Sequence, residues 1–385
     1  MYNILTLNKI SEAGLSHFDP AKYTCSTDAE NPTAILVRSA KMHDMTFSPE
    51  TLAIARAGAG TNNIPVEACT EQGIVVFNTP GANANAVKEL VLCGLLLSSR
   101  KIVPGIEFAR SLKGNGDEVG KLVEKGKSAF KGPEIMGKKL GVIGLGAIGV
   151  LVANAAKSLG MEVYGYDPYL SVDAAWHLSR SIHHAKDLDE IFTECDYITV
   201  HVPLTDETKG IINAESIARM KDGIRILNFA RGGLVDTGAV VEALQNGKVA
   251  SYVTDFAEDD LLGEPGVIVM PHLGASTPES EDNCARMAAF ELIDYLENGN
   301  IRNSVNLPAA EMPRSTDYRL CAIHKNVPNV LNQITARFTD TNISNFTNRS
   351  RGEIAYTILD LDSEIPEEAL EAIRGIEGVI RVRTL

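Results

Sequence analysis

A glycine-rich turn between an apolar strand and a helix constrains this chain more than any other feature. A buried strand is predicted over Lys139–Ile143 and a helix over Val150–Leu159, and between them stands the sequence Gly-Leu-Gly-Ala-Ile-Gly of residues 144–149. A G-x-G-x-x-G pattern in this strand–turn–helix context is typical of a dinucleotide-binding unit built on a parallel sheet.

Each glycine of this turn has its own physical task. Gly144 permits the tight turn, Gly146 lets the backbone approach a pyrophosphate, and Gly149 lets the helix pack closely on the strand. The free N–H groups and the positive dipole end of the helix then favour the phosphates. Asp167 follows the next predicted strand, where its carboxylate can accept hydrogen bonds from a ribose diol. The same carboxylate would repel a 2′-phosphate, so the sequence predicts NAD rather than NADP.

Short apolar runs alternate with helical stretches over most of the chain, which predicts an α/β fold with two Rossmann-like, doubly wound lobes. The strands predicted for the first lobe are Asn3–Leu7, Ala34–Val37, Ala53–Ala57 and Ile74–Val76. Those predicted for the second lobe are Lys139–Ile143, Glu162–Tyr166, Tyr197–Val200, Arg225–Asn228, Ala250–Thr254 and Val267–Met270.

Long helices are predicted where the chain passes between the lobes. Residues 83–101 place apolar side chains three and four apart, and residues 276–298 begin with Ser-Thr-Pro-Glu, a helix-start pattern. We therefore expect a discontinuous substrate-binding lobe (residues 1–84 and 273–308) and an NAD-binding lobe (residues 85–272). A polar, proline-containing linker then precedes a third domain, residues 317–385.

The third domain has a different order of predicted elements, strand–helix–strand–strand–helix–strand. This βαββαβ order is ferredoxin-like. Its elements are predicted at Tyr318–Ile323, Pro328–Phe338, Ile343–Asn348, Glu353–Leu361, Pro366–Arg374 and Val379–Arg383.

Charge and composition argue against several classes of partner. The chain has 36 Lys and Arg against 50 Asp and Glu, a net charge of −14, so it lacks the excess of basic residues typical of duplex binding. The six cysteines form no C-x-x-C pair, and the first residues do not resemble a signal peptide. The longest apolar helical run, Val87–Leu97, is shorter than the ~20 residues that span a bilayer. We expect a cytoplasmic protein without a metal site, a nucleic-acid partner or a membrane segment.

Polar groups follow three predicted strands of the second lobe, in residues 228–233, 255–260 and 271–274. Ligands of an open α/β sheet bind at the carboxyl ends of its strands. Removal of a hydride from a secondary alcohol needs a base for the hydroxyl proton, an acid that orients the base, and a cation that holds the substrate. His272, an acid near residues 258–260 and Arg231 are the candidates for these roles.

Together these motifs resemble the D-isomer-specific 2-hydroxyacid dehydrogenases, over about residues 1–308. The matching residues are those of the turn 144–149, Asp167, Ala230-Arg231-Gly232, Asp255 and Pro271-His272. The resemblance implies an NAD-dependent oxidoreductase whose two lobes close around a 2-hydroxy acid. It implies cofactor contacts by Gly144, Gly146, Ala147, Ile148, Gly149, Asp167, Ala230, Arg231, Asp255, His272 and Gly274.

The same resemblance implies a phosphorylated substrate. Arg38, Ser39 and Asn83 would bind it together with Arg231, and Arg38 would pair with the phosphate. Plainer interpretations also exist, since Arg38 fits a surface charge and Asn83 fits the cap of the long helix that follows it.

Two departures from the family pattern concern the second lobe. Ala147 stands where the family usually has Arg, which removes a charge near the cofactor but leaves the backbone turn. An ungapped alignment from Arg231 assigns the catalytic acid to Asp260, whereas alignment on Phe256 assigns it to Asp259. We prefer Asp260 and keep Asp259 as the alternative.

The C-terminal βαββαβ unit resembles an ACT domain, a regulatory module that binds small ligands. By this resemblance His324 and Asn326, with Asn342 from a neighbouring copy, would bind L-serine. Asn329 stands where the family usually has Gly; Asn tolerates left-handed geometry, but its side chain could obstruct the effector.

The resemblance favours an enzyme that forms a homodimer or homotetramer, with a dimer through the nucleotide-binding lobes. Another D-2-hydroxyacid dehydrogenase, such as a hydroxypyruvate or glyoxylate reductase, is the first alternative. A binding protein that senses NAD on the same scaffold is the second, and NAD-dependent partner binding without turnover would indicate it.

Overall fold

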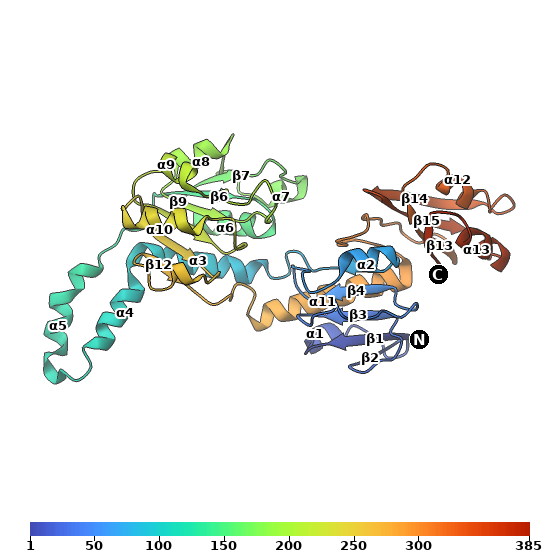
Figure 1. Cartoon of the computed structure of the whole chain (residues 1–385), viewed down its shortest axis with the longest axis horizontal. Helices are drawn as coiled ribbons and strands as arrows, with labels where there is room; N and C mark the ends of the chain where they lie inside the picture. The colour runs from blue at the N-terminus through green and yellow to red at the C-terminus, as the bar shows by residue number, and fades with distance from the viewer. The chain divides into compact units, whose positions relative to one another are not determined.

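The computed structural model describes the whole chain, Met1–Leu385, and Figure 1 shows its elements. The chain forms two compact units, residues 1–83 with 278–385, and residues 84–277. The crossovers lie at the starts of two long helices, α3 (Ala84–Arg100) and α11 (Pro278–Asn298). Both helices were predicted, whereas the second boundary was expected at residues 272–273. None of the helices combines the length and apolar character that a membrane crossing requires.

The first unit contains a five-stranded parallel sheet with the strand order β2-β1-β3-β4-β5. This is a doubly wound order, the one described as flavodoxin-like. The strand β2 was not predicted, because its sequence Tyr-Thr-Cys-Ser has no apolar run. The elements are β1 (Tyr2–Leu7), α1 (Glu12–Leu15), β2 (Tyr23–Ser26), β3 (Ala34–Val37), β4 (Ala53–Arg56), α2 (Val66–Glu71) and β5 (Val75–Phe77).

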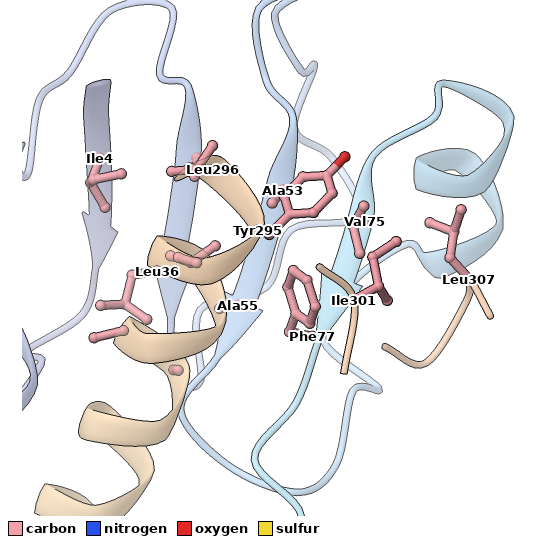
Figure 2. Packing of buried hydrophobic residues seen from close by; sticks show 14 of the residues in the cluster. Ile4, Leu36, Ala53, Ala55, Val75, Phe77, Tyr295, Leu296, Ile301 and Leu307 are labelled. Atoms are coloured by element: carbon pink, nitrogen blue, oxygen red, sulfur yellow. The ribbon is translucent and has the colours of Figure 1, made fainter. Parts of the chain in front are cut away.

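Helix α11 covers one face of this sheet, and Figure 2 shows its Tyr295 and Leu296 among side chains of the strands. A glycine lets α1 approach the same helix closely, because an added Cβ on Gly14 of α1 would overlap the backbone of Ala285 in α11. Tyr295 and Leu296 are fully buried. Burial of a leucine side chain contributes roughly 1.5–3 kcal/mol, so this face fixes α11 on the sheet.

The second unit contains a seven-stranded parallel sheet in the order β12-β11-β10-β9-β6-β7-β8. The chain order reverses between β6 and β9, and such a switch point is where doubly wound sheets bind ligands. Its strands are β6 (Lys139–Ile143), β7 (Glu162–Tyr166), β8 (His183–His184), β9 (Tyr197–Val200), β10 (Ile224–Asn228), β11 (Val249–Thr254) and β12 (Val267–Val269).

Helices connect these strands and cover the sheet. They are α6 (Ala147–Ser158), α7 (Val172–His177), α8 (Leu188–Glu194), α9 (Ala214–Arg219) and α10 (Thr237–Gln245), with a 3-10 turn η3 (Asp259–Leu261) after β11.

A helical hairpin, α4 (Ile102–Ser111) and α5 (Val119–Gly126), extends away from the sheet of the second unit (Figure 1). Neither helix contains a buried residue, and the ring centroids of Phe108 and Phe130 lie 5.2 Å apart at its base. No element was predicted here. Short 3-10 turns, η1 (Gly116–Glu118) and η2 (Lys127–Phe130), border α5.

The C-terminal module, residues 317–385, has the predicted βαββαβ order, with an antiparallel sheet in the order β14-β15-β13-β16. The module and the first lobe share a hydrophobic core and belong to one compact unit. The division of the module as a separate domain therefore remains a prediction. The elements are β13 (Tyr318–Lys325), α12 (Val330–Thr335), β14 (Ile343–Arg351), β15 (Ile354–Leu361), α13 (Glu367–Arg374) and β16 (Val379–Thr384).

Candidate active site

The turn after β6 requires glycine at two positions because of its backbone conformation and its close packing with neighbouring backbone. Gly144 has φ +94°, a region that disfavours other residues, and an added Cβ would lie 2.7 Å from the carbonyl oxygen of His201. An added Cβ on Gly149 would overlap the carbonyl oxygen of Gly144. The helix can therefore pack on the turn only without a side chain at 149.

Gly146 differs, because an added Cβ there would meet nothing within 4 Å. It is the N-cap of α6, and no side chain accepts a hydrogen bond from the first turn of that helix, which begins with Ala147 and Ile148. Free backbone donors beside open space suit a pyrophosphate. The local geometry therefore fits a dinucleotide.

Asp167 holds the next loop in shape at the end of β7. Its Oδ2 accepts a hydrogen bond from the N–H of Leu145 at 2.8 Å, and its Oδ1 accepts one from the N–H of Tyr169 at 2.8 Å. A carboxylate offers about four lone-pair directions, so acceptor capacity remains for a ribose diol. Asp167 thus links the glycine turn to the expected ribose position.

His201 follows β9, the other strand of the switch point. Its Nε2 pairs with Thr199 Oγ1 at 2.9 Å, while its Nδ1 is buried without a partner. Burial lowers the pKa of His201 to about 4, so the ring is neutral. A structural role fits this histidine, because its backbone lies against Gly144.

The candidates for chemistry follow three adjacent strands, β10, β11 and β12, at one edge of the sheet. Neighbouring strands lie about 4.8 Å apart, so the ends of β10 and β12 are about 10 Å apart. Arg231 is exposed after β10, and its guanidinium donates to the carbonyl of Ala230 at 2.7 Å. Asn228 fixes this loop by donating to the carbonyl of Arg231 at 2.8 Å.

Asp255 ties the end of β11 to the loop that carries His272. It is 2% exposed, its Oδ2 accepts a hydrogen bond from the N–H of Gly274 at 3.2 Å, and its Oδ1 is buried without a partner. Burial raises the pKa of Asp255, while the nearby imidazole of His272 and the N–H of Gly274 oppose that rise. The unpartnered oxygen fits a hydrogen-bond donor of a bound ligand.

His272 is exposed, and its ring meets that of Phe256 edge to face, with centroids 5.0 Å apart. Asp259 and Asp260 both lie in η3 and are exposed, and neither forms an ion pair with His272. Glu258 is engaged elsewhere, because its Oε2 accepts a hydrogen bond from Thr237. The choice between Asp260 and Asp259 stays a prediction.

The candidate substrate residues of the first unit follow β3 and precede α3. Arg38 donates to Glu281 Oε1 at 2.7 Å, in an ion pair where both side chains are about 40% exposed. The backbone N–H of Ser39 donates to Asn8 at 2.9 Å. Asn83 is half-buried at the crossover. Glu281 was not singled out from the sequence; its place in the first turn of α11 was the available signal.

The candidate regulatory residues of the C-terminal module differ in accessibility. His324 is buried, its Nδ1 pairs with the carbonyl of Lys325 and its Nε2 with Thr357. Asn326 and Asn342 are exposed. Asn329 adopts the left-handed conformation with φ 72°, so it accepts the geometry for which the family uses Gly.

Comparison with known proteins assigns a family to these elements. Residues 102–274 match the family "D-isomer specific 2-hydroxyacid dehydrogenase, NAD binding domain". The chain is 35% identical over 327 residues to a D-3-phosphoglycerate dehydrogenase of Bacillus subtilis, covering 80% of this chain and 60% of that protein. It is 32% identical over 355 residues to that of Haemophilus influenzae, covering 88% of this chain and 82% of that protein. The match thus spans less than two thirds of the Bacillus relative.

Solved structures show the same fold. An NAD+-bound 3-phosphoglycerate dehydrogenase of Entamoeba histolytica aligns with a TM-score of 0.59 and 26% identity, over 79% of this chain and 98% of that chain. A glyoxylate reductase of Paecilomyes thermophila aligns with a TM-score of 0.64 and 25% identity, over 79% and 98%. Residues 102–274 are therefore an NAD-binding domain, as the glycine turn predicted, and the chain belongs to the D-isomer-specific 2-hydroxyacid dehydrogenase family.

Proposed function

We propose that this chain oxidises D-3-phosphoglycerate to 3-phosphohydroxypyruvate with NAD, the first step of the phosphorylated route to L-serine. The observation that carries this proposal is the similarity to relatives that bear the name D-3-phosphoglycerate dehydrogenase, one of them aligned over 88% of this chain. The complete set of an arginine, a histidine and nearby acids at one sheet edge supports it.

NAD accepts the hydride when it is bound. The backbone of Gly144, Gly146 and Gly149 with the first turn of α6 would hold the pyrophosphate, and Asp167 would hold the ribose. The residues further assigned to the cofactor site are Ala147, Ile148, Ala230, Arg231, Asp255, His272 and Gly274. The buried, unpartnered Oδ1 of Asp255 supports a role as acceptor for the amide of the nicotinamide.

His272 takes the hydroxyl proton of the substrate, because a neutral imidazole is a base near physiological pH. Asp260 stabilises the imidazolium that forms, and Arg231 binds the substrate carboxylate and polarises the reacting C–O bond. Asp255 holds the loop of His272 through Gly274.

Arg38, with Ser39 and Asn83, binds the phosphate end of the substrate in this proposal. Glu281 already occupies the guanidinium of Arg38, so a phosphate must displace or share that contact. An exposed ion pair contributes only about 0–1 kcal/mol, and a phosphate, with more negative charge, can compete for the guanidinium.

The same ion pair favours a second candidate function. A reductase of an unphosphorylated 2-oxo acid, such as hydroxypyruvate or glyoxylate, has no phosphate for Arg38 to bind, and Glu281 would then be its lasting partner.

The test is NADH production by the purified full chain with D-3-phosphoglycerate, beside glycerate, and NADH consumption in the reverse direction with hydroxypyruvate and glyoxylate. We expect the phosphorylated acid to have the highest kcat/KM, with NAD preferred over NADP. Preference for an unphosphorylated acid would overturn the proposal in favour of the reductase. NAD binding without turnover of any substrate would favour an NAD-sensing binding protein.

We infer that residues 317–385 form an ACT-like regulatory module and that the enzyme is a homodimer or homotetramer. The βαββαβ order supports the first inference. Because both ring nitrogens of His324 are engaged, L-serine binding rests on the exposed Asn326 and Asn342. L-serine in the activity assay tests this: inhibition that Asn326→Ala weakens supports it, and activity unchanged by serine removes it.

A further inference from the structure

A cavity of about 680 Å³ lies on the first unit and has no part in the proposed reaction. Its wall is formed by α11, the segment 298–303 that follows, and Gly81 and Ala82 before the first crossover. The α11 residues in the wall include Arg286, Met287 and Phe290. A volume of this size is in the range of sites for small molecules, roughly 300–1,000 Å³.

One acid in this wall is buried but incompletely bonded. Glu291 is 7% exposed; its Oε1 accepts a hydrogen bond from Asn303 at 2.6 Å, and its Oε2 has no partner. Burial raises the pKa of Glu291 to about 8, against the opposing effects of Asn303 and Arg302. A buried polar atom without a partner destabilises a protein, so the ionised carboxylate, present above about pH 8, calls for a donor from a ligand at this oxygen.

A cation in the same wall is also without a partner. Arg286, five residues before Glu291 on α11, forms no hydrogen bond or ion pair. The other charged wall residues are engaged: Arg302 pairs with Glu311, and Asp294 accepts hydrogen bonds from the amides of the same segment. The cavity therefore leaves one acid and one guanidinium for a ligand.

The rest of the wall adds apolar surface beside these groups. Phe290 is 52% exposed although it is a large aromatic residue, and Met287 and Ile293 lie in the same wall. A ligand that satisfies the whole wall needs an ammonium group, a carboxylate and an apolar part.

We propose that this cavity binds a free α-amino acid with a large apolar side chain. Its ammonium group would donate to Glu291, its carboxylate would pair with Arg286, and its side chain would cover Phe290 and Met287. The proposal is independent of the proposed reaction, because no wall residue has a role in it. Gly81 and Ala82, which precede α3 in the chain, would also contact the ligand.

The experiment is calorimetric titration of the full chain at about pH 8 with L-phenylalanine, 2-phenylethylamine and 3-phenylpropionate. These ligands are chosen because charge-assisted hydrogen bonds to Glu291 and Arg286 would contribute most of the binding. The two analogues each lack one charged group. Glu291→Gln should weaken L-phenylalanine and 2-phenylethylamine about tenfold and leave 3-phenylpropionate unchanged. Arg286→Gln should weaken 3-phenylpropionate and leave 2-phenylethylamine unchanged. Glu279→Gln, an exposed glutamate of the same helix outside the wall, should change none of them.

Proton linkage gives a second readout. The ammonium group prefers ionised Glu291, so the affinity for 2-phenylethylamine should rise from about pH 7 to about pH 8.5 and be flat in Glu291→Gln. The glutamine still offers Asn303 an acceptor, and an unchanged melting temperature verifies that the variant folds. No detectable binding of L-phenylalanine at millimolar concentration, or equal affinities in wild type and both variants, would overturn the proposal.

Discussion

Two adjacent aspartates of η3 are candidates for the acid that stabilises protonated His272. Asp260→Asn should lower kcat by about 10²-fold and move the acidic limb of the kcat/KM–pH profile, because the imidazolium loses its counter-charge. Asp259→Asn should stay within about twofold of wild type. Steady-state kinetics between about pH 5.5 and about pH 9 distinguishes them. The opposite ranking would assign the role to Asp259, and full activity in both would exclude η3 as its source.

The ion pair of Arg38 with Glu281 gives a prediction about the substrate. Glu281→Gln frees the guanidinium, so the KM for D-3-phosphoglycerate should fall about two- to fivefold with kcat unchanged, since exposed pairs contribute about 0.2–1 kcal/mol. Arg38→Ala should raise KM for the phosphorylated acid more than for glycerate. Equal effects on both acids would remove the phosphate role of Arg38.

These residues also show which parts of a site could be predicted from sequence. Gly144, Gly149 and Asp167 lie within one strand–helix–strand unit, β6–α6–β7, so their spacing alone indicated their roles. Glu281 is 243 positions from Arg38 in the chain, and only the fold brings the two together. The burial of Glu291 likewise depends on the segment 298–303 that folds beside α11, which no local pattern reveals.

Among the elements, the glycine turn contains one glycine that we assign to NAD binding and another that the packing of the helix requires. Gly146 has φ −73° and open space at its Cβ position, so Gly146→Ala should shift the melting temperature by less than about 3 °C. It should weaken NAD at least about tenfold, because the methyl group occupies the path of the pyrophosphate. Thermal unfolding and fluorescence titration with NADH check both. Gly149→Ala is the contrast, since its Cβ overlaps the turn and should lower stability. Unchanged NAD affinity in Gly146→Ala would contradict the pyrophosphate assignment.

The hairpin of α4 and α5 shows where patterns stop predicting elements. Neither helix has a buried residue. Val119, Leu122 and Val123 of α5 do lie three and four apart, but α5 has only eight residues, fewer than the roughly 11–18 over which such spacing identifies a helix. Pro104 and Gly105 in the first turns of α4 obscured the pattern further.

The exposed apolar residues of this hairpin fit the dimer that we infer. Ile102 and Ile106 are 41% and 46% exposed. Ile106→Asp should raise the dimer dissociation constant at least about tenfold, because a charge would be buried against the partner. Sedimentation velocity over a dilution series measures it, with Lys121→Ala as the exposed control. A dimer as stable as wild type would place the interface elsewhere.

At the scale of the whole molecule, the inner strands β13 and β15 of the C-terminal sheet are buried on both faces. Side chains at alternate positions of β13 point to opposite sides, as strand geometry requires. Leu320 and Ala322 pack with α12 and α13, whereas Cys321 and Ile323 belong to the core that contains Tyr295 of α11. The βαββαβ order was predictable from the periodicity of these residues, but the second buried face was not, because its partner is the first lobe.

A buried ion pair fastens this module to the rest of its unit. Arg319 and Asp360 are 0% exposed and bonded at 2.6 Å and 2.9 Å, and Arg319 also donates to the carbonyls of Asn298 and Met312. Burial would raise the pKa of Asp360, but hydrogen bonds from Arg319 and Ser315 outweigh it and lower the pKa. The pair thus joins β13 and β15 to the end of α11 and to the linker.

Breaking and replacing this pair should have different consequences. Asp360→Asn leaves the guanidinium buried without its counter-charge and should cost about 3–5 kcal/mol of unfolding free energy. The double variant Arg319→Met with Asp360→Leu buries no charge and should cost less than the single variant, although two carbonyls lose their donor. Urea unfolding of the single and double variants measures this difference in unfolding free energy. If Asp360→Asn unfolds at the wild-type urea midpoint, the pair does not hold the module, and the shared apolar core of Tyr295, Cys321 and Tyr356 must do so alone.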